Sequence, residues 1–293
     1  MTIAKPACKP LLLVVVVTLV LAGCSRMRIA YNSADFFIER YADDYLSLDS
    51  AQMERWTPTL EAALARHRAQ ELPYLATFFD SAQRDARKGF RHADTVCLMD
   101  QFEVIYRRHF TLAADAAAPL LAELDKQQID ALERTFRKEA RDDAADNDRQ
   151  SVEHRLRKRA KRYEENMQWW IGDLTDAQRA IVRQVTRSIP DTAKDWYQYR
   201  DGKRRELIKL LRAGASEQRI QAFLTDWLVH YSDLPSSLRR AQPELRRGVS
   251  DLLVRLDPTL DVAQRRHFID RLTKLRDDFM ALQKHPHMVP TGC

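Results

Sequence analysis

Acidic side chains near the N-terminus are the first residues whose type and spacing suggest chemistry. Asp43 and Asp44 are adjacent, so on a helix their side chains point roughly 100° apart and do not converge locally. Asp35, Glu39 and Asp43 are four residues apart and would share one helix face. Paired carboxylates catalyse acid–base reactions when their environments separate their pKa values. We expect instead that this face is solvated, or that it anchors the first helix through a polar network.

His67 and Glu71 are also four residues apart, a spacing that can place two ligands on one metal ion. However, His67 ends an apolar helical stripe, and the chain has no HExxH motif or obvious third ligand. We therefore expect a core histidine bonded to a carboxylate, with no metal and no other cofactor. His109, on a similar stripe, is interpreted in the same way.

A basic segment, HRLRKRAKR, spans residues 154–162. Its cations could bind anionic lipid headgroups, phosphates or an acidic partner. Leu156 and Ala160 continue an apolar stripe through the segment, which favours solvated flanks of a buried helix over an anion or partner site. The cations in question are Arg155, Arg157, Lys158, Arg159, Lys161 and Arg162.

Signatures of common enzymes are missing from the sequence. The chain has 7 glycines, too dispersed for a phosphate-binding loop, and no GxSxG elbow. Carboxylate pairs of the glycosidase type leave no local signature, so an enzyme of that type stays open. Removing residues 1–23, which hold two lysines and no acids, leaves a net charge of (48 − 2) − 42 = +4. So small a charge on a long chain does not indicate a nucleic-acid partner.

The N-terminus has the pattern of an export signal. Lys5 and Lys9 precede an apolar run over residues 11–22, which is too short to span a bilayer. Leu21, Ala22, Gly23 and Cys24 then resemble the lipobox of bacterial lipoproteins. The resemblance implies cleavage before Cys24 and acyl chains that anchor this residue to a membrane. Ser25 stands where an aspartate would retain a lipoprotein at the inner membrane, so the resemblance favours the outer membrane, facing the periplasm.

Two cysteines remain after Cys8 leaves with the signal and Cys24 takes the lipid. An oxidising periplasm permits a disulfide between Cys97 and Cys293, if the fold brings their Cα atoms within reach. The segment 285–293 contains two prolines, and we expect it to be loose unless Cys293 is bonded.

A short pattern, L-[DT]-x-x-Q, recurs four times and predicts four helix starts. Asp or Thr would cap the helix and Gln would return to the capping N–H, which is a capping box. The copies begin at Leu48, Leu124, Leu174 and Leu260, at irregular intervals that do not establish a true repeat. Helical stripes follow these starts and strand signals are nearly absent. We predict an all-α protein: a signal peptide (1–23), a tether (24–30), one bundle of roughly eight to ten helices (31–284) and a tail (285–293).

The blocks AYNSAD (30–35), YADDYL (41–46) and LDSAQ (48–52) resemble an uncharacterised family of proteobacterial lipoproteins. This resemblance implies an all-helical envelope lipoprotein and supplies no activity. LTDAQ (174–178) also resembles the LTxxQ motif of small periplasmic chaperones, although a capping box explains the same letters.

Our leading hypothesis is a non-enzymatic binding or assembly factor, held at the membrane by its lipid, with an envelope protein as partner. A holdase-like chaperone and a carboxylate-dependent enzyme acting on an envelope polymer are the alternatives. The sequence does not indicate an oligomeric state.

Overall fold

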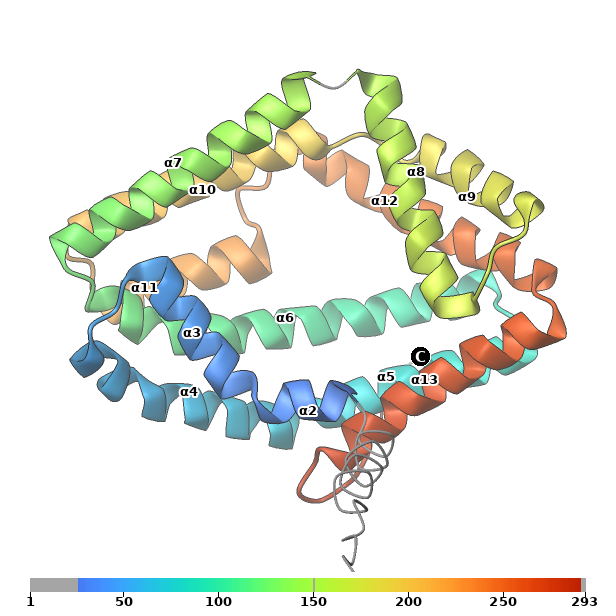
Figure 1. Cartoon of the computed structure of the whole chain (residues 1–293), viewed down its shortest axis with the longest axis horizontal. Helices are drawn as coiled ribbons and strands as arrows, with labels where there is room; N and C mark the ends of the chain where they lie inside the picture. Colours follow the sequence, from blue (N-terminus) through green and yellow to red (C-terminus); the bar gives the residue numbers. More distant parts are fainter. Residues whose placement is uncertain (1–25, 150, 291–293) are drawn as a thin grey trace, which may run out of the picture.

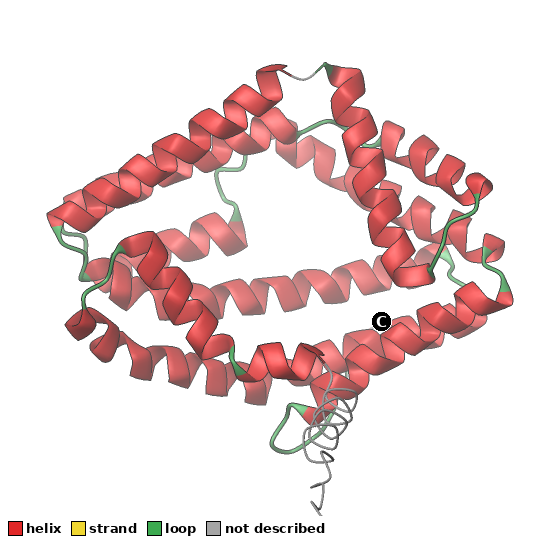
Figure 2. Ribbon diagram, viewed as in Figure 1, coloured by secondary structure: helices red, strands yellow, loops and turns green. Residues whose placement is uncertain are grey.

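The computed structural model describes residues 26–149 and 151–290, and every regular element in these ranges is helical (Figure 2). This confirms the all-α prediction. Short connections divide the chain more finely than the sequence suggested: only Ser33 separates the first two helices. The elements are α2 (Arg26–Asn32), α3 (Ala34–Leu46), α4 (Ser50–Gln70), α5 (Leu72–Lys88), α6 (His92–Ala122), α7 (Lys126–Arg149), α8 (Val152–Ile171), α9 (Asp176–Ser188), α10 (Ala193–Arg212), α11 (Glu217–Thr225), the π-helix η1 (Asp226–His230), α12 (Ser236–Leu256), the 3-10 helix η2 (Asp257–Thr259) and α13 (Val262–Ala281).

The helices form a frame-like outline made largely of helix pairs (Figure 1). The pair α7–α10 lies on one side and the pair α5–α13 on the opposite side, while the long α6 runs between them. The apolar core is correspondingly divided into separate clusters. The largest, which includes Trp56, Leu132, Leu207 and Ile220, joins α4, α6, α7, α10 and α11. Separate groups of buried side chains therefore hold different parts of the frame together.

All four predicted helix starts are confirmed. Asp49, Thr175 and Asp261 form complete capping boxes with the glutamine three residues later. Asp125 makes the same two hydrogen bonds with Gln128, at 2.8 and 2.9 Å. The glutamines are buried, unlike most capping residues on a helix surface. Their burial has a structural reason, because the four starts meet in two pairs.

In the first glutamine junction, residues 47–53 meet residues 123–129. Gln52 and Gln128 donate their side-chain amides to each other's Oε1, at 3.0 and 2.6 Å. Gln52 Nε2 also donates to the Glu123 carbonyl at 3.0 Å, and Gln128 Nε2 donates to the Ser47 carbonyl at 2.9 Å. Each carbonyl lies two residues before the opposite helix cap. The junction thus has local two-fold symmetry.

The second glutamine junction, residues 173–179 with 259–265, repeats this arrangement. Gln178 and Gln264 exchange amide hydrogen bonds of 2.8 and 3.0 Å. Gln178 Nε2 donates to the Thr259 carbonyl at 3.1 Å, and Gln264 Nε2 donates to the Asp173 carbonyl at 2.7 Å. The four sequence motifs therefore make two equivalent junctions, the first with the second copy and the third with the fourth.

The helices that leave the junctions cross between the two halves of the chain. From the first junction, α7 packs on α10 of the second half; from the second junction, α13 packs on α5 of the first half. The contacts α4–α6 and α9–α12 are equivalent in the same sense. The described residues thus form two similarly connected halves, each of which supplies a helix to the other.

Close packing fixes two further parts of the frame. At Gly248 on α12, an added Cβ would lie 2.6 Å from Cγ1 of Ile189, so these segments approach too closely for a side chain. After α13, one residue of the tail contacts α5: Val289 N donates to Thr77 Oγ1 at 3.1 Å, and Thr77 Oγ1 donates to the Val289 carbonyl at 2.8 Å. Residues 284–288, which precede this contact, are exposed.

Candidate functional site: an apolar groove ending at two histidines

A groove of about 370 Å³ lies between α3, α4 and α6. Its walls are apolar because each helix turns an aliphatic and aromatic face towards the other two. Trp56 is fixed by a hydrogen bond of 2.8 Å from its Nε1 to the Ala116 carbonyl. The lining residues are Ile38, Tyr41, Ala42, Tyr45, Leu46, Trp56, Leu60, Ala63, Leu64, His67, His109, Leu112, Ala113, Ala116, Ala117, Leu120 and Leu121. Five alanines among them leave the space that longer side chains would fill.

Two histidines line the end of the groove nearest α2. The rings of His67 and His109 lie edge to face, with centroids 4.7 Å apart. Tyr31 of α2 places its hydroxyl 2.8 Å from Nδ1 of His67. His109 Nδ1 is 2.7 Å from the Ile105 carbonyl, which can only accept, so His109 carries its proton on Nδ1. Residues of three helices thus meet at the histidine pair.

Burial sets the charge of this cluster. Desolvation, reinforced by the neighbouring His109, lowers the pKa of His67 to about 4, so its ring is neutral at neutral pH. Burial raises the pKa of Tyr31 to about 12, which keeps the hydroxyl protonated. Tyr31 and His67 therefore share one hydrogen bond between two uncharged groups.

Glu71 is held by an ion pair on the next helix turn. Arg108 donates to it through Nε at 2.6 Å and Nη2 at 2.9 Å. The guanidinium also lies over the Tyr74 ring, 4.2 Å from its centroid. Glu71 is 3% exposed, so this two-pronged pair satisfies a buried charge. The expected histidine–carboxylate bond is thus replaced by Tyr31–His67 and Arg108–Glu71.

Exposed apolar side chains gather on α2 and α3. We call this set the N-terminal face; it consists of Met27, Ile29, Phe36, Phe37, Ile38 and Tyr41, all at least 37% exposed. Ile38 and Tyr41 also line the groove, so the set borders the groove through these two residues. Within residues 26–149 and 151–290, no helix is long and apolar enough to cross a bilayer.

A family model of unknown function, DUF6279, matches residues 44–233. The chain belongs to this family. The match covers both junction-forming starts of α4 and α7 and the histidine pair, and it ends before α12. No curated protein and no solved structure matches the chain. Membership therefore identifies relatives without assigning an activity, and functional inference for this DUF6279 member depends on its own geometry.

The predicted acidic residues do not converge in this DUF6279 protein. Asp35, Asp43 and Asp44 are all exposed on α3. Asp44 pairs with Arg40 at 3.2 Å, and Glu39 accepts a hydrogen bond of 2.7 Å from Thr57. The structure thus places Asp35, Asp43 and Asp44 on a solvated surface. Glu39, on the same helix, joins α3 to α4 through Thr57. Nothing in their arrangement favours a catalytic carboxylate pair.

The basic segment of α8 is largely engaged in ion pairs and helix-end contacts. Arg155 pairs with Asp191 at 2.8 Å, and Arg159 donates to the Ile189 and Pro190 carbonyls at 2.8 and 2.9 Å. Arg157 and Lys161 face Glu153 and Glu165 on their own helix at 3.6 and 3.8 Å; Lys158 and Arg162 are exposed. Four of the six cations thus have partners within the protein, and an anion or partner site at this segment stays a hypothesis.

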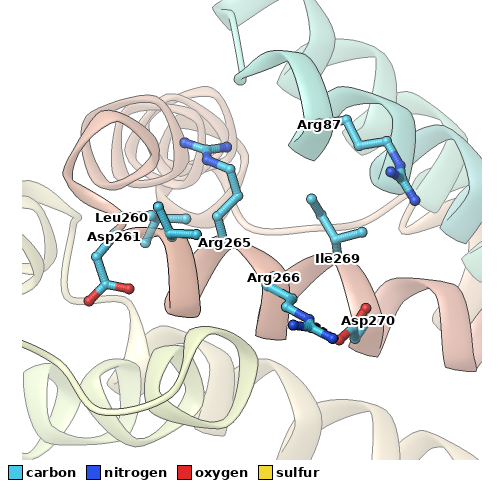
Figure 3. A pocket seen from close by; sticks show the side chains of 8 residues that line it. Arg87, Leu260, Asp261, Arg265, Arg266, Ile269 and Asp270 are labelled. Carbon is cyan, nitrogen blue, oxygen red and sulfur yellow. Dashed lines mark ion pairs between the residues drawn. The ribbon is translucent and has the colours of Figure 1, made fainter.

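A charged hollow of about 390 Å³ lies beside the start of α13 (Figure 3). Arg266 and Asp270, one turn apart on α13, form an ion pair of 3.8 Å, and Arg87 of α5 lies across from them. Arg265 donates to the Ala86 carbonyl at 2.8 Å. These contacts attach the second glutamine junction to α5. Within the described chain, no group of three or more His, Cys, Asp or Glu residues could hold a metal ion.

Some predictions concern residues at the edge of the described chain. Cys97 on α6 is disulfide-bonded, and its Sγ accepts a hydrogen bond of 3.3 Å from Gln101. Cys293 lies outside the described residues, so the Cys97–Cys293 pairing stays a prediction. The lipobox residues Leu21 to Cys24, and Ser25, also lie outside them.

Sequence reasoning missed the partners of His67 and Glu71. Tyr31 and Arg108 had no local pattern that pointed to them, since each reaches its partner from another helix. The signal available was indirect: His67 and His109 each end or interrupt an apolar stripe, which is typical of a polar group inside a helix contact.

Proposed function

We propose that this protein is a lipid-anchored envelope protein, facing the periplasm, that acts by binding and not by catalysis. The observation that carries the proposal is the N-terminal face. Cys24, the predicted lipid attachment site, precedes Arg26 by two residues, and α2 begins there. The exposed apolar side chains therefore follow directly after the anchor.

The position of the N-terminal face gives it a physical role. Phe36 and Phe37 are 62% and 59% exposed, and water contact with such rings is unfavourable. Helices with exposed apolar side chains bind at the boundary between headgroups and acyl chains, in addition to any covalent lipid. In this proposal the acyl chains on Cys24 and the N-terminal face contact the same bilayer.

Ser25 favours the outer membrane as the site of this anchor, for the reason given by the lipobox resemblance. The body of the protein would then extend into the periplasm and present its grooves to envelope components. The all-helical frame, its apolar groove and its solvated acids support a binding role. An envelope protein is the partner expected for such a surface.

The anchor is tested with the full chain expressed in cells fed an alkynyl fatty acid. We expect the protein to take up the label and to float with membranes in a density gradient. Cys24→Ser should abolish labelling, whereas Cys8→Ser, a matched change inside the signal, should leave it intact. Labelling that persists in Cys24→Ser would show that the lipobox interpretation is wrong.

A second candidate function is a holdase-like chaperone, and one observation favours it. A larger groove of about 740 Å³ lies between α6, η1 and α12, where Phe102 and Leu245 are exposed. Exposed apolar grooves can hold unfolded chains. We expect Phe102→Asp to weaken suppression of aggregation of a denatured outer-membrane protein. Val262→Asp, at a residue that is exposed but lies outside this groove, is the control; equal effects of the two variants would count against a chaperone site.

A further inference from the structure

We infer that the groove between α3, α4 and α6 binds one acyl chain of a membrane phospholipid. The inference rests on the proposed function, because it requires the bilayer to lie against the N-terminal face. It adds a ligand class and a binding site to that function. The argument uses the lining, the size and the position of the groove.

The lining is suited to hydrocarbon. No Asp, Glu, Lys or Arg is among the residues that surround the groove in the described chain. His67 is neutral, so it adds a polar but uncharged group at one end. An aliphatic chain buried there would remove its methylene groups from water, which is favourable. A charged peptide would find no ionic partner on these walls.

The size of the groove is typical of a small-ligand site. The space between α3, α4 and α6 is about 370 Å³. It lies within the range of roughly 300–1,000 Å³ for small-ligand sites. An extended acyl chain is thin enough to lie along it.

The position of the groove indicates where the chain would come from. Ile38 and Tyr41 belong both to the N-terminal face and to the lining of the groove. Cys24 stands two residues before α2, and α2 itself is about 10 Å long at 1.5 Å per residue. A bilayer holding the lipid on Cys24 would therefore lie close to the mouth of the groove. The phospholipids of that bilayer would be the most abundant source of acyl chains at the groove.

The end of the groove nearest α2 gives the ligand a defined limit. His67 and His109 are held in place by Tyr31 and by the Ile105 carbonyl, at 2.8 and 2.7 Å. Such fixed rings do not withdraw to extend the cavity. The histidine pair would therefore set the limit that the acyl chain reaches on the side of α2.

The experiment uses the lipidated full chain in vesicles of phosphatidylethanolamine and phosphatidylglycerol that contain some phosphatidylcholine with a diazirine on its acyl chain. After illumination, crosslinked peptides are identified by mass spectrometry. We expect crosslinks on α4 and α6, in addition to α3. Vesicle flotation is measured in parallel, because it reports on the anchor and not on the groove.

Ala63→Phe with Ala113→Phe would fill the groove, since both alanines line it and neither is fully buried. We expect the double variant to lose the α4 and α6 crosslinks while flotation is unchanged. Ala62→Phe with Ala122→Phe places the same rings at exposed positions of the same helices, outside the groove, and should retain the crosslinks.

Three results would overturn the inference. Crosslinks confined to the outer face of α2 and α3 would show that the bilayer touches the protein without entering the groove. Crosslinks that survive in the filled variant would place the lipid elsewhere. An adduct formed only when the diazirine is on the fatty acid attached to Cys24 would make the protein's own anchor the occupant. Failure of the lipidated chain without substitutions to float with the vesicles would instead refute the proposed function.

Discussion

The two glutamine junctions allow a quantitative prediction about what holds the frame together. Gln52→Leu would remove four hydrogen bonds: two with Gln128, one to the Glu123 carbonyl and one from the Asp49 N–H. A buried hydrogen bond contributes about 1 kcal/mol, and the partners left behind are largely buried. We therefore expect Gln52→Leu to lower the free energy of unfolding by about 3–4 kcal/mol. Gln128→Leu should have a similar effect.

The double variant separates the junction from simple capping. Each single change removes both bonds between Gln52 and Gln128, so the double variant loses those two bonds only once. Its destabilisation should fall short of the sum of the single effects by about 2 kcal/mol. Urea unfolding followed by far-UV circular dichroism, with Cys24→Ser in every protein, measures this difference. Gln52→Leu combined with Gln178→Leu, in separate junctions, should be additive within about 0.5 kcal/mol. Additivity within the first junction would refute the reasoning.

Three further predictions concern stability. Gly248→Ala should cost about 1–3 kcal/mol by overpacking, whereas Gly202→Ala, where an added Cβ meets nothing within 4 Å, should stabilise α10 by up to about 1 kcal/mol; thermal melts of the two variants should therefore shift in opposite directions. The pKa of His67 is lowered from 6.5 to about 4 by folding, so the unfolded chain binds more protons between these values and stability should fall by up to about 3 kcal/mol as the pH drops through this window. Urea titrations at several pH values should show a shallower dependence in His67→Gln, and an unchanged dependence would contradict this assignment. Arg108→Met would leave the Glu71 carboxylate buried without its partner and should cost about 3–5 kcal/mol, measured by urea unfolding, unless a second change to Gln at Glu71 restores part of the loss.

Rules of local structure were sufficient to predict where four of the helices start. Asp49, Asp125, Thr175 and Asp261 cap their helices as expected, because a capping box is formed by residues three apart and needs no tertiary contact. Pairing of the starts could not be predicted in the same way. The paired glutamines are 76 and 86 residues apart, and the 50-residue interval between the pairs hides the duplication in the sequence.

The candidate site shows the same limit. His67 and Glu71 could be singled out from their spacing, and the structure does place both on adjoining turns. Their partners could not be predicted, because Tyr31 and Arg108 are 36 and 37 residues away along the chain. The groove needed three helices to be placed at once, and its five alanines read in the sequence only as strong helix formers.

The contact between α5 and α13 has a consequence for how the protein reaches its folded state. Gln83 and Thr273, which are hydrogen-bonded across this contact, are separated by 190 residues. The apolar face of α5 therefore emerges early and stays without its partner until almost the whole chain has followed. Loop closure over such a distance is slow compared with helix formation, so the frame should close last. In the proposed form tethered at Cys24, the chain would complete this closure beside the membrane. There the apolar face of α5 could contact lipid until α13 packs on it.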